Sequence, residues 1–100
     1  MATVSKALAR TAAATSSATL YTVPSSTTTV VSNIAVTNTA ASAGTFTLTL
    51  NSVALHTTTA IAANTTVYID LKQVLTTGQI IAGLASATTI NFHISGVEVS

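Results

Sequence analysis

The strongest constraint on this chain is a strict alternation of side chains near its middle. In the segment 45–50, threonines alternate with Phe46, Leu48 and Leu50. Successive side chains of a β-strand point to opposite faces of a sheet, so this alternation predicts a strand with one buried face and one polar face. We place this strand at the centre of an all-β domain.

A second strand is predicted just before it, at Thr28–Thr37. This segment is rich in β-branched residues, which suit a pleated surface, and it places Val30, Ile34 and Val36 on one side. A small, polar connector that contains Gly44 joins the two segments. Two alternating runs joined in this way indicate a β-hairpin, and we expect the rest of the domain to be organised around it.

Similar short segments recur at roughly ten-residue spacing, which is typical of a sandwich or barrel. Further strands are predicted at 19–23, 53–57, 66–71, 79–85 and 89–99. A helical turn also fits the segment Leu71–Leu75. The expected fold is all-β, a single compact β-sandwich or barrel, jelly-roll-like, with about seven or eight short antiparallel strands.

The last predicted strand changes the parity of its apolar residues. Ile90, Phe92 and Ile94 share one parity, whereas Val97 and Val99 have the other. The change falls at glycine 96, and an extra residue at a glycine is typical of a β-bulge. We therefore expect a bulge there that returns the two valines to the core side.

The first eighteen residues are predicted to form an N-terminal arm, separate from a β-domain that spans 19–100. Val4, Ala7 and Leu8 have helical spacing, but the segment 12–17 is small and polar and has no apolar anchor. Two interpretations stay open. The arm is either a short amphipathic helical turn or an extended segment that becomes ordered only against a neighbouring molecule.

Charge is unusually scarce, at 5% of residues, against about a quarter in a typical soluble domain. The chain has three lysine or arginine residues and no cysteine. Nucleic-acid binding through a basic patch is not expected, because three cations neutralise few phosphates. No apolar run is long enough to span a bilayer, so no membrane partner is expected. A neutral surface of hydroxyl and methyl groups has little repulsion between copies, which favours assembly.

No constellation of residues indicates an enzyme, and we predict no catalytic, cofactor-binding or metal-binding residues. His56, His93, Asp70 and Glu98 are the candidate metal ligands, but they fall on different predicted strands without a ligand spacing motif. We expect His93 to point away from the core because it is out of phase with its apolar neighbours. No nucleophile-elbow pattern of the G-x-S-x-G kind is present.

Two other pairs have possible binding roles. Tyr21 and Tyr68 could form a sugar-stacking surface, although packing at the edge of the core with a solvated hydroxyl is the commoner use of tyrosine. Lys6 and Arg10 are four residues apart and could share one side of a helical turn, facing an acidic partner or simply solvent.

Four segments resemble small virion structural proteins of tailed bacteriophages: Leu20–Pro24, Val30–Asn38, Ala43–Leu48 and the ending Ile94–Val99. The resemblance covers roughly residues 19 to 99 and carries over no functional residues. It implies a compact β-domain without enzymatic activity or cofactor, made in the host cytoplasm and located on the virion surface. Its expected role is that of a capsid decoration or cement protein, which binds the major capsid protein on the outside of the head.

The same resemblance implies a homo-oligomer, with a trimer favoured. One alternative is a tail- or fibre-associated virion component that binds a host surface glycan. A non-viral adhesion or matrix domain is a further alternative. The scarcity of aromatic residues argues against the glycan binder, and the absence of a secretory signal pattern argues against the secreted domain.

Overall fold

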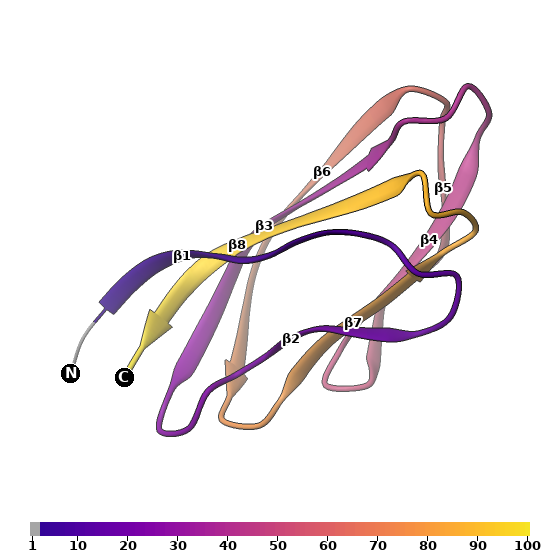
Figure 1. Cartoon of the computed structure of the whole chain (residues 1–100). Coiled ribbons are helices and arrows are strands. Elements are labelled where there is room, and N and C mark those ends of the chain that lie inside the picture. Colours follow the sequence, from indigo (N-terminus) through magenta and orange to yellow (C-terminus); the bar gives the residue numbers. More distant parts are fainter. Residues whose placement is uncertain (1–2) are drawn as a thin grey trace.

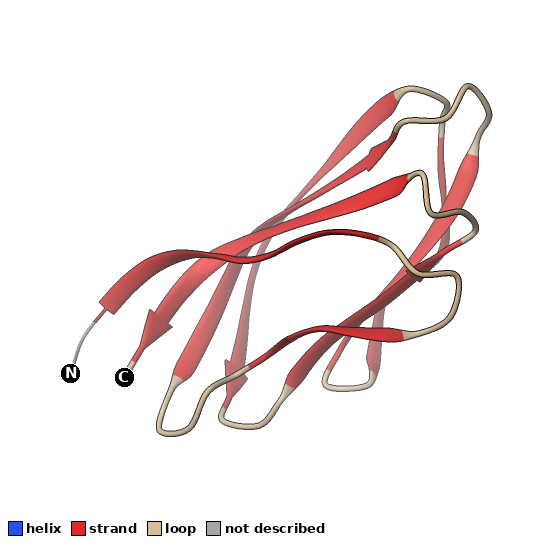
Figure 2. Ribbon diagram, in the orientation of Figure 1, coloured by secondary structure: helices blue, strands red, loops and turns tan. Residues whose placement is uncertain are grey.

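The computed structural model describes residues 3–100, and eight strands account for most of them (Figure 2). The strands are β1 (Thr3–Ala12), β2 (Ala18–Thr22), β3 (Thr28–Asn38), β4 (Gly44–Leu50), β5 (Val53–Ile61), β6 (Thr65–Thr76), β7 (Ile80–Ala85) and β8 (Ile90–Val99). Residues 3–100 contain no helical segment that could cross a lipid bilayer.

The strands form two four-stranded sheets that face each other across the core (Figure 1). Sheet A has the order β1-β8-β3-β6 and sheet B has the order β2-β7-β4-β5. In both sheets, every pair of neighbouring strands is antiparallel. The first strand pairs with the last, the second with the seventh, the third with the sixth and the fourth with the fifth. A long hairpin rolled up in this way is a jelly roll, which confirms the predicted fold class.

The predicted hairpin of β3 and β4 is wrong, because the two strands lie in opposite sheets. Their connector crosses from sheet A to sheet B, so that their apolar faces meet across the core instead of lying side by side. Among the described strands, β4 and β5 are the consecutive pair that forms a hairpin. The turn between them places Asn51 and Ser52 at positive φ, 50° and 64°, a backbone region that suits tight turns.

Irregularities in β3 change which of its residues face the core. The register with both neighbouring strands shifts between Val31 and Asn33. As a result Val31 is buried together with Ile34 and Val36, whereas Val30 is only partly covered. The predicted core position of Val30 is therefore wrong, since the extra residue inverts the alternation before it.

The predicted bulge at Gly96 is also wrong. β8 keeps its alternation through Gly96, and the extra residues belong to its neighbours β1 and β3. Gly96 faces the interior, where an added Cβ would overlap the carbonyl oxygen of Val30. The glycine therefore allows close approach of β3. Val97 and Val99 stay on the outer side, and Glu98 is directed inward instead.

Both segments for which a helical turn was considered are strands. Residues 3–12 form β1, which pairs with β8 of the same chain and buries Leu8. The segment is therefore extended, and it pairs with a strand of its own chain. The segment Leu71–Leu75 continues β6, because its backbone pairs with the start of β3. In both places the hydrogen-bond ladder of a neighbouring strand overrides the local helical spacing.

The centre of the core joins the two sheets through aromatic side chains. Phe46 of sheet B and Phe92 of sheet A are 1% and 0% exposed. Their ring centroids lie 6.4 Å apart at an interplanar angle of 73°, an edge-to-face arrangement that aromatic pairs favour. The molecule is elongated, with extents of 45 × 21 × 18 Å, and both termini lie at one end (Figure 1).

Candidate functional site

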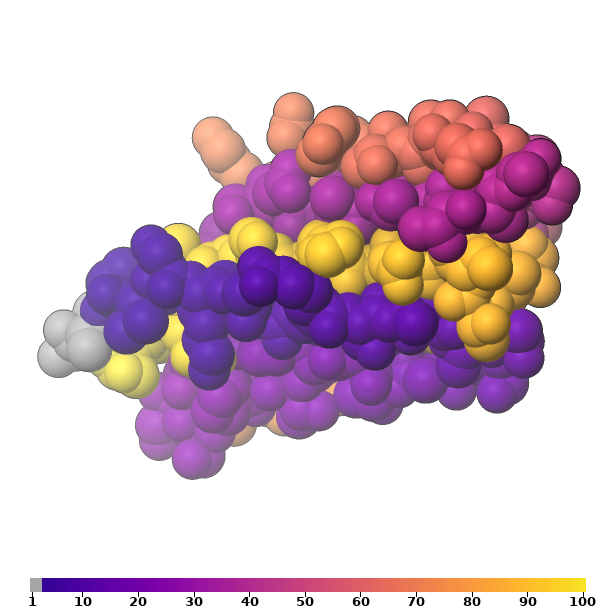
Figure 3. Space-filling view, turned by 45° about the horizontal axis from the view of Figure 1, so that its top comes forward, coloured from indigo at the N-terminus to yellow at the C-terminus, as the bar shows by residue number. Residues whose placement is uncertain are grey.

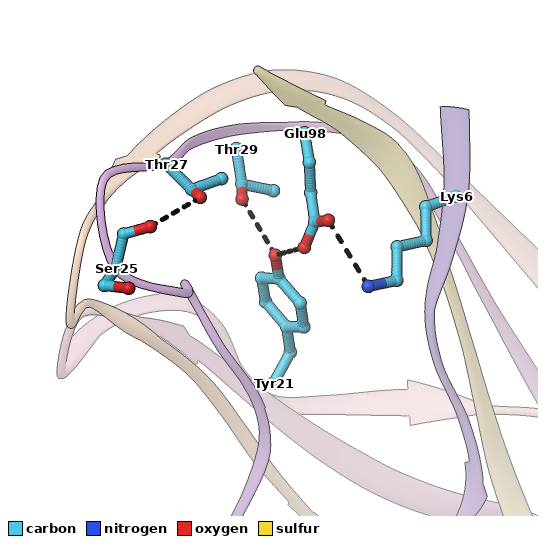
Figure 4. Close-up of polar contacts among 6 residues, drawn as sticks. All are labelled: Lys6, Tyr21, Ser25, Thr27, Thr29 and Glu98. Carbon is cyan, nitrogen blue, oxygen red and sulfur yellow. Dashed lines mark hydrogen bonds and ion pairs between the residues drawn. The ribbon is translucent and has the colours of Figure 1, made fainter. Parts of the chain in front are cut away.

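A chain of polar side chains joins the two sheets near the end of β8 (Figure 4). Tyr21 of β2 reaches across from sheet B, and its hydroxyl donates a hydrogen bond to Glu98 Oε2 of β8. Because that hydroxyl has a single proton, it accepts from Thr29 Oγ1 of β3, 2.8 Å away. Glu98 Oε1 accepts from Lys6 Nζ of β1 at 3.3 Å. The Glu98 carboxylate and the Tyr21 hydroxyl together thus connect β1, β3 and β8 of sheet A to β2 of sheet B.

The contacts of this cluster shift the pKa values of two groups in opposite directions. The pKa of Glu98 is lowered, chiefly by the hydrogen bond from Tyr21, and Lys6 lowers it further. The pKa of Tyr21 is raised, chiefly by burial and then by its bond to the carboxylate. Near neutral pH the glutamate is therefore charged and the phenol is protonated. The cluster is a polar contact between the sheets.

The candidate metal ligands do not come together. His56 lies on β5 of sheet B, where its ring is 5.6 Å from that of Phe46 and its Nδ1 is 3.3 Å from Thr59 Oγ1. His93 lies on the outer side of sheet A, as its phase predicts, and Asp70 lies on β6. Within residues 3–100, no group of three histidine, cysteine or acidic side chains could hold a metal ion.

The two other predicted pairs are also separated. Tyr21 is buried between the sheets, whereas Tyr68 is 71% exposed on β6, so the tyrosines share no surface. Lys6 lies opposite Gly96 on the inner side of sheet A, and Arg10 lies opposite His93 on its outer side. In a regular strand, two residues four apart would face the same side. The bulge in β1 between Lys6 and Arg10 turns them to opposite faces.

Charge is distributed very unevenly between the two sheets. The charged side chains lie on β1, β6 and β8 of sheet A: Lys6, Arg10, Asp70, Lys72 and Glu98. Within the described residues, the four strands of sheet B carry no lysine, arginine, aspartate or glutamate. Composition alone did not reveal this separation, because composition does not indicate which strands share a sheet.

An open hollow lies on sheet A where the ladder between β3 and β6 is interrupted. Its volume is about 510 Å³, and it is lined by Ser32, Asp70, Leu71 and Lys72. Val31 pairs with Gln73 and Asn33 pairs with Asp70, so the residues between these two pairs do not match one to one. Asn33 Nδ2 donates to Asp70 Oδ1 at 3.4 Å beside the hollow. The sequence offered no signal for this feature, since the mismatch arises only when the two strands are paired.

No model of a known protein family and no curated protein sequence matches this chain. The case for a function therefore rests on the residues themselves.

Proposed function

We propose that this chain is a non-enzymatic virion protein that decorates the head of a tailed bacteriophage and stabilises it by bridging capsid subunits. The observation that carries the proposal is the uncharged outer face of sheet B. A cement protein needs a rigid module with a surface that can be buried against other subunits, and it needs no chemistry. The jelly roll itself does not decide the matter, because capsid proteins, lectins and enzymes all use it.

The outer face of sheet B is suited to burial in a protein contact. Thr45, Thr47 and Thr49 line its central strand β4, opposite the buried side chains of the same strand. On β5, Ala60 lies opposite Thr45 and Ala54 lies opposite Thr49. Burying an unpaired charge is costly, and this face has none to bury. Ordering alanine costs little side-chain entropy, and threonine hydroxyls can bond across the contact.

The free edges of the sheets supply a second kind of contact. β5 is an edge strand of sheet B, nine residues long. Edge strands with few charges are normally a liability, because their unpaired backbone groups pair with other chains. In an assembly the same groups are covered by neighbouring subunits. The proposed capsid shell or a second copy of this chain provides such cover.

The first test is the solution mass, measured by light scattering coupled to size exclusion. We expect a discrete oligomer, a trimer near three times the 10.0 kDa of the chain. Thr49→Lys places a charge at the centre of sheet B and is expected to reduce the mass of the oligomer. Thr76→Lys adds the same charge at an exposed position of sheet A and is expected to leave the mass unchanged. Thermal unfolding of both variants verifies that each is folded.

The second test separates head decoration from a tail role. Quantitative mass spectrometry of virus particles that contain the chain counts its copies per particle. A head decoration protein is expected in hundreds of copies, and a tail or fibre component in a handful. A monomer in solution that is also absent from particles, or present in a few copies, would overturn the proposal.

A further inference from the structure

We propose that the outer face of sheet A, opposite in the molecule to the face assigned to assembly, carries a binding site for a neutral saccharide. Tyr68 would form the aromatic platform, and Asp70 and Asn33 would form the polar part, beside an open hollow. The proposal rests on sheet A alone and does not depend on the capsid role. Figure 3 looks onto this sheet, where β6 lies beside β3, followed by β8 and β1.

Strand register brings the proposed groups onto one face. Tyr68 lies opposite Ala35 of β3, and Ala35 lies opposite His93 of β8. The small alanine between the two rings leaves the tyrosine ring open to one side. Asp70 is two residues from Tyr68 along β6 and therefore points to the same face, opposite Asn33. The aromatic ring and the carboxylate–amide pair are thus neighbours.

The exposure of Tyr68 is the first observation that points to a ligand. Its side chain is 71% exposed, and its neighbour across the β3–β6 ladder is the small Ala35, which covers little of the ring. A flat ring with one polar tip offers a large contact area and loses little conformational entropy on binding. The C–H groups on one face of a pyranose ring match such a surface.

The second observation is the open hollow that adjoins Asp70, on the side of this residue away from Tyr68 along β6. Its volume of about 510 Å³ falls within the range of about 300–1,000 Å³ that small-molecule sites occupy. The Asp70 carboxylate accepts hydrogen bonds and the Asn33 amide both donates and accepts, so the pair can bind adjacent sugar hydroxyls. Asp70 and Lys72 carry opposite charges beside the hollow, which favours a neutral ligand over an anionic one.

A second copy of the chain is a poorer occupant for this face. A protein contact would have to remove water from Asp70, Lys72 and Arg10, and the structure offers no opposite charge on sheet B to pair with them. A saccharide leaves these groups partly hydrated and replaces the remaining water with its own hydroxyls. The charges that disfavour a protein partner are therefore compatible with a sugar.

The test uses the full chain on an array of neutral hexose and N-acetylhexosamine oligosaccharides, followed by NMR titration of the ¹⁵N-labelled protein with the strongest binder. We expect amide shifts confined to the segments around Asn33 and Asp70. Tyr68→Ala should weaken binding by about tenfold or more, the loss expected from removing part of a buried aromatic contact. Val74→Ala is the matched control, because Val74 is 60% exposed on the same strand and lies outside the site.

Three results would overturn the proposal: no binding to any saccharide of the array, binding that Tyr68→Ala leaves unchanged, or amide shifts on sheet B instead of sheet A. The outcome is separable from that of the capsid proposal. Tyr68→Ala is expected to retain the oligomer mass of the unmodified chain, and Thr49→Lys is expected to retain saccharide binding.

Discussion

Replacing Phe46 with alanine should remove a large part of the stability of this domain. Phe46 is 1% exposed at the centre of the core, and its edge-to-face contact with Phe92 joins sheet B to sheet A. Truncating a buried phenylalanine to alanine costs about 3–5 kcal/mol, because the apolar contact is lost and a cavity remains. A domain of this length has a free energy of unfolding of about 5–15 kcal/mol. The variant should therefore have a much lower free energy of unfolding than the unmodified chain, and it should be close to unfolded if the unmodified chain lies at the lower end of this range.

The assay is urea unfolding followed by circular dichroism, with thermal melting as a second measurement. Each 1 kcal/mol shifts the Tm of a domain of this size by about 4–8 °C, so we expect Phe46→Ala to lower the Tm by more than about 10 °C. Thr45→Ala is the control, since Thr45 lies next to Phe46 on the same strand but faces outward. Its effect should stay within about 0.5 kcal/mol.

A loss below about 1 kcal/mol for Phe46→Ala would refute the assignment of this residue to the core. The cross-sheet contact is tested separately by a double-mutant cycle of Phe46→Leu and Phe92→Leu. We expect a coupling energy of about 0.5–1.5 kcal/mol between the two rings. Additive effects would show that the rings pack into the core independently of each other.

The remaining predictions concern sheet A and the polar cluster. Gly96→Ala should lower the free energy of unfolding by about 1–3 kcal/mol or more, because the new methyl group meets the backbone of Val30; an unchanged urea midpoint would contradict this packing. Because the pKa of Glu98 is lowered in the folded state, its carboxylate stabilises the fold above the unfolded pKa of about 4.3, and this contribution is lost on acidification. Urea midpoints measured against pH should show a smaller acid loss in Glu98→Gln. The raised pKa of Tyr21 has the opposite sign: its contribution is present below the unfolded value of about 10 and is lost as the pH rises through the folded value. Absorbance titration of a Tyr68→Phe variant isolates Tyr21, and ionisation at or below pH 10 would refute this. Deleting residues 3–12 should lower the Tm, since it removes the buried side chain of Leu8 and exposes the edge of β8; an unchanged Tm would show that β1 adds nothing to the fold.

Where a strand is regular, the local sequence pattern was sufficient to predict which of its side chains point into the core. The alternation in 45–50 correctly predicted that Phe46, Leu48 and Leu50 are buried, and the phase of the last strand correctly predicted that His93 points outward. These results follow from the two-residue period of a strand, which depends on no other part of the chain. The strand predicted at 66–71 is present but was predicted too short, because its continuation depends on pairing with β3.

The local sequence pattern did not predict how two strands are placed relative to each other. Alternation reports that a strand has a buried face, and a hairpin and a pair of facing strands give the same signal. The sequence therefore could not distinguish a hairpin of β3 and β4 from strands on opposite sides of the core. It also could not locate the bulges beside Gly96, since an extra residue is defined only against the register of a partner strand.

The amino-acid pattern was enough to identify an all-β domain with little charge, since both properties are local or additive over residues. Which strands share a sheet depends on the tertiary structure, and so do the gathering of the charges on sheet A, the contact of Tyr21 with Glu98 and the contact of Asn33 with Asp70. The physical reason is that the partners in each contact lie far apart in the sequence. Backbone hydrogen bonds and burial of the common core, acting over the whole chain, bring them together.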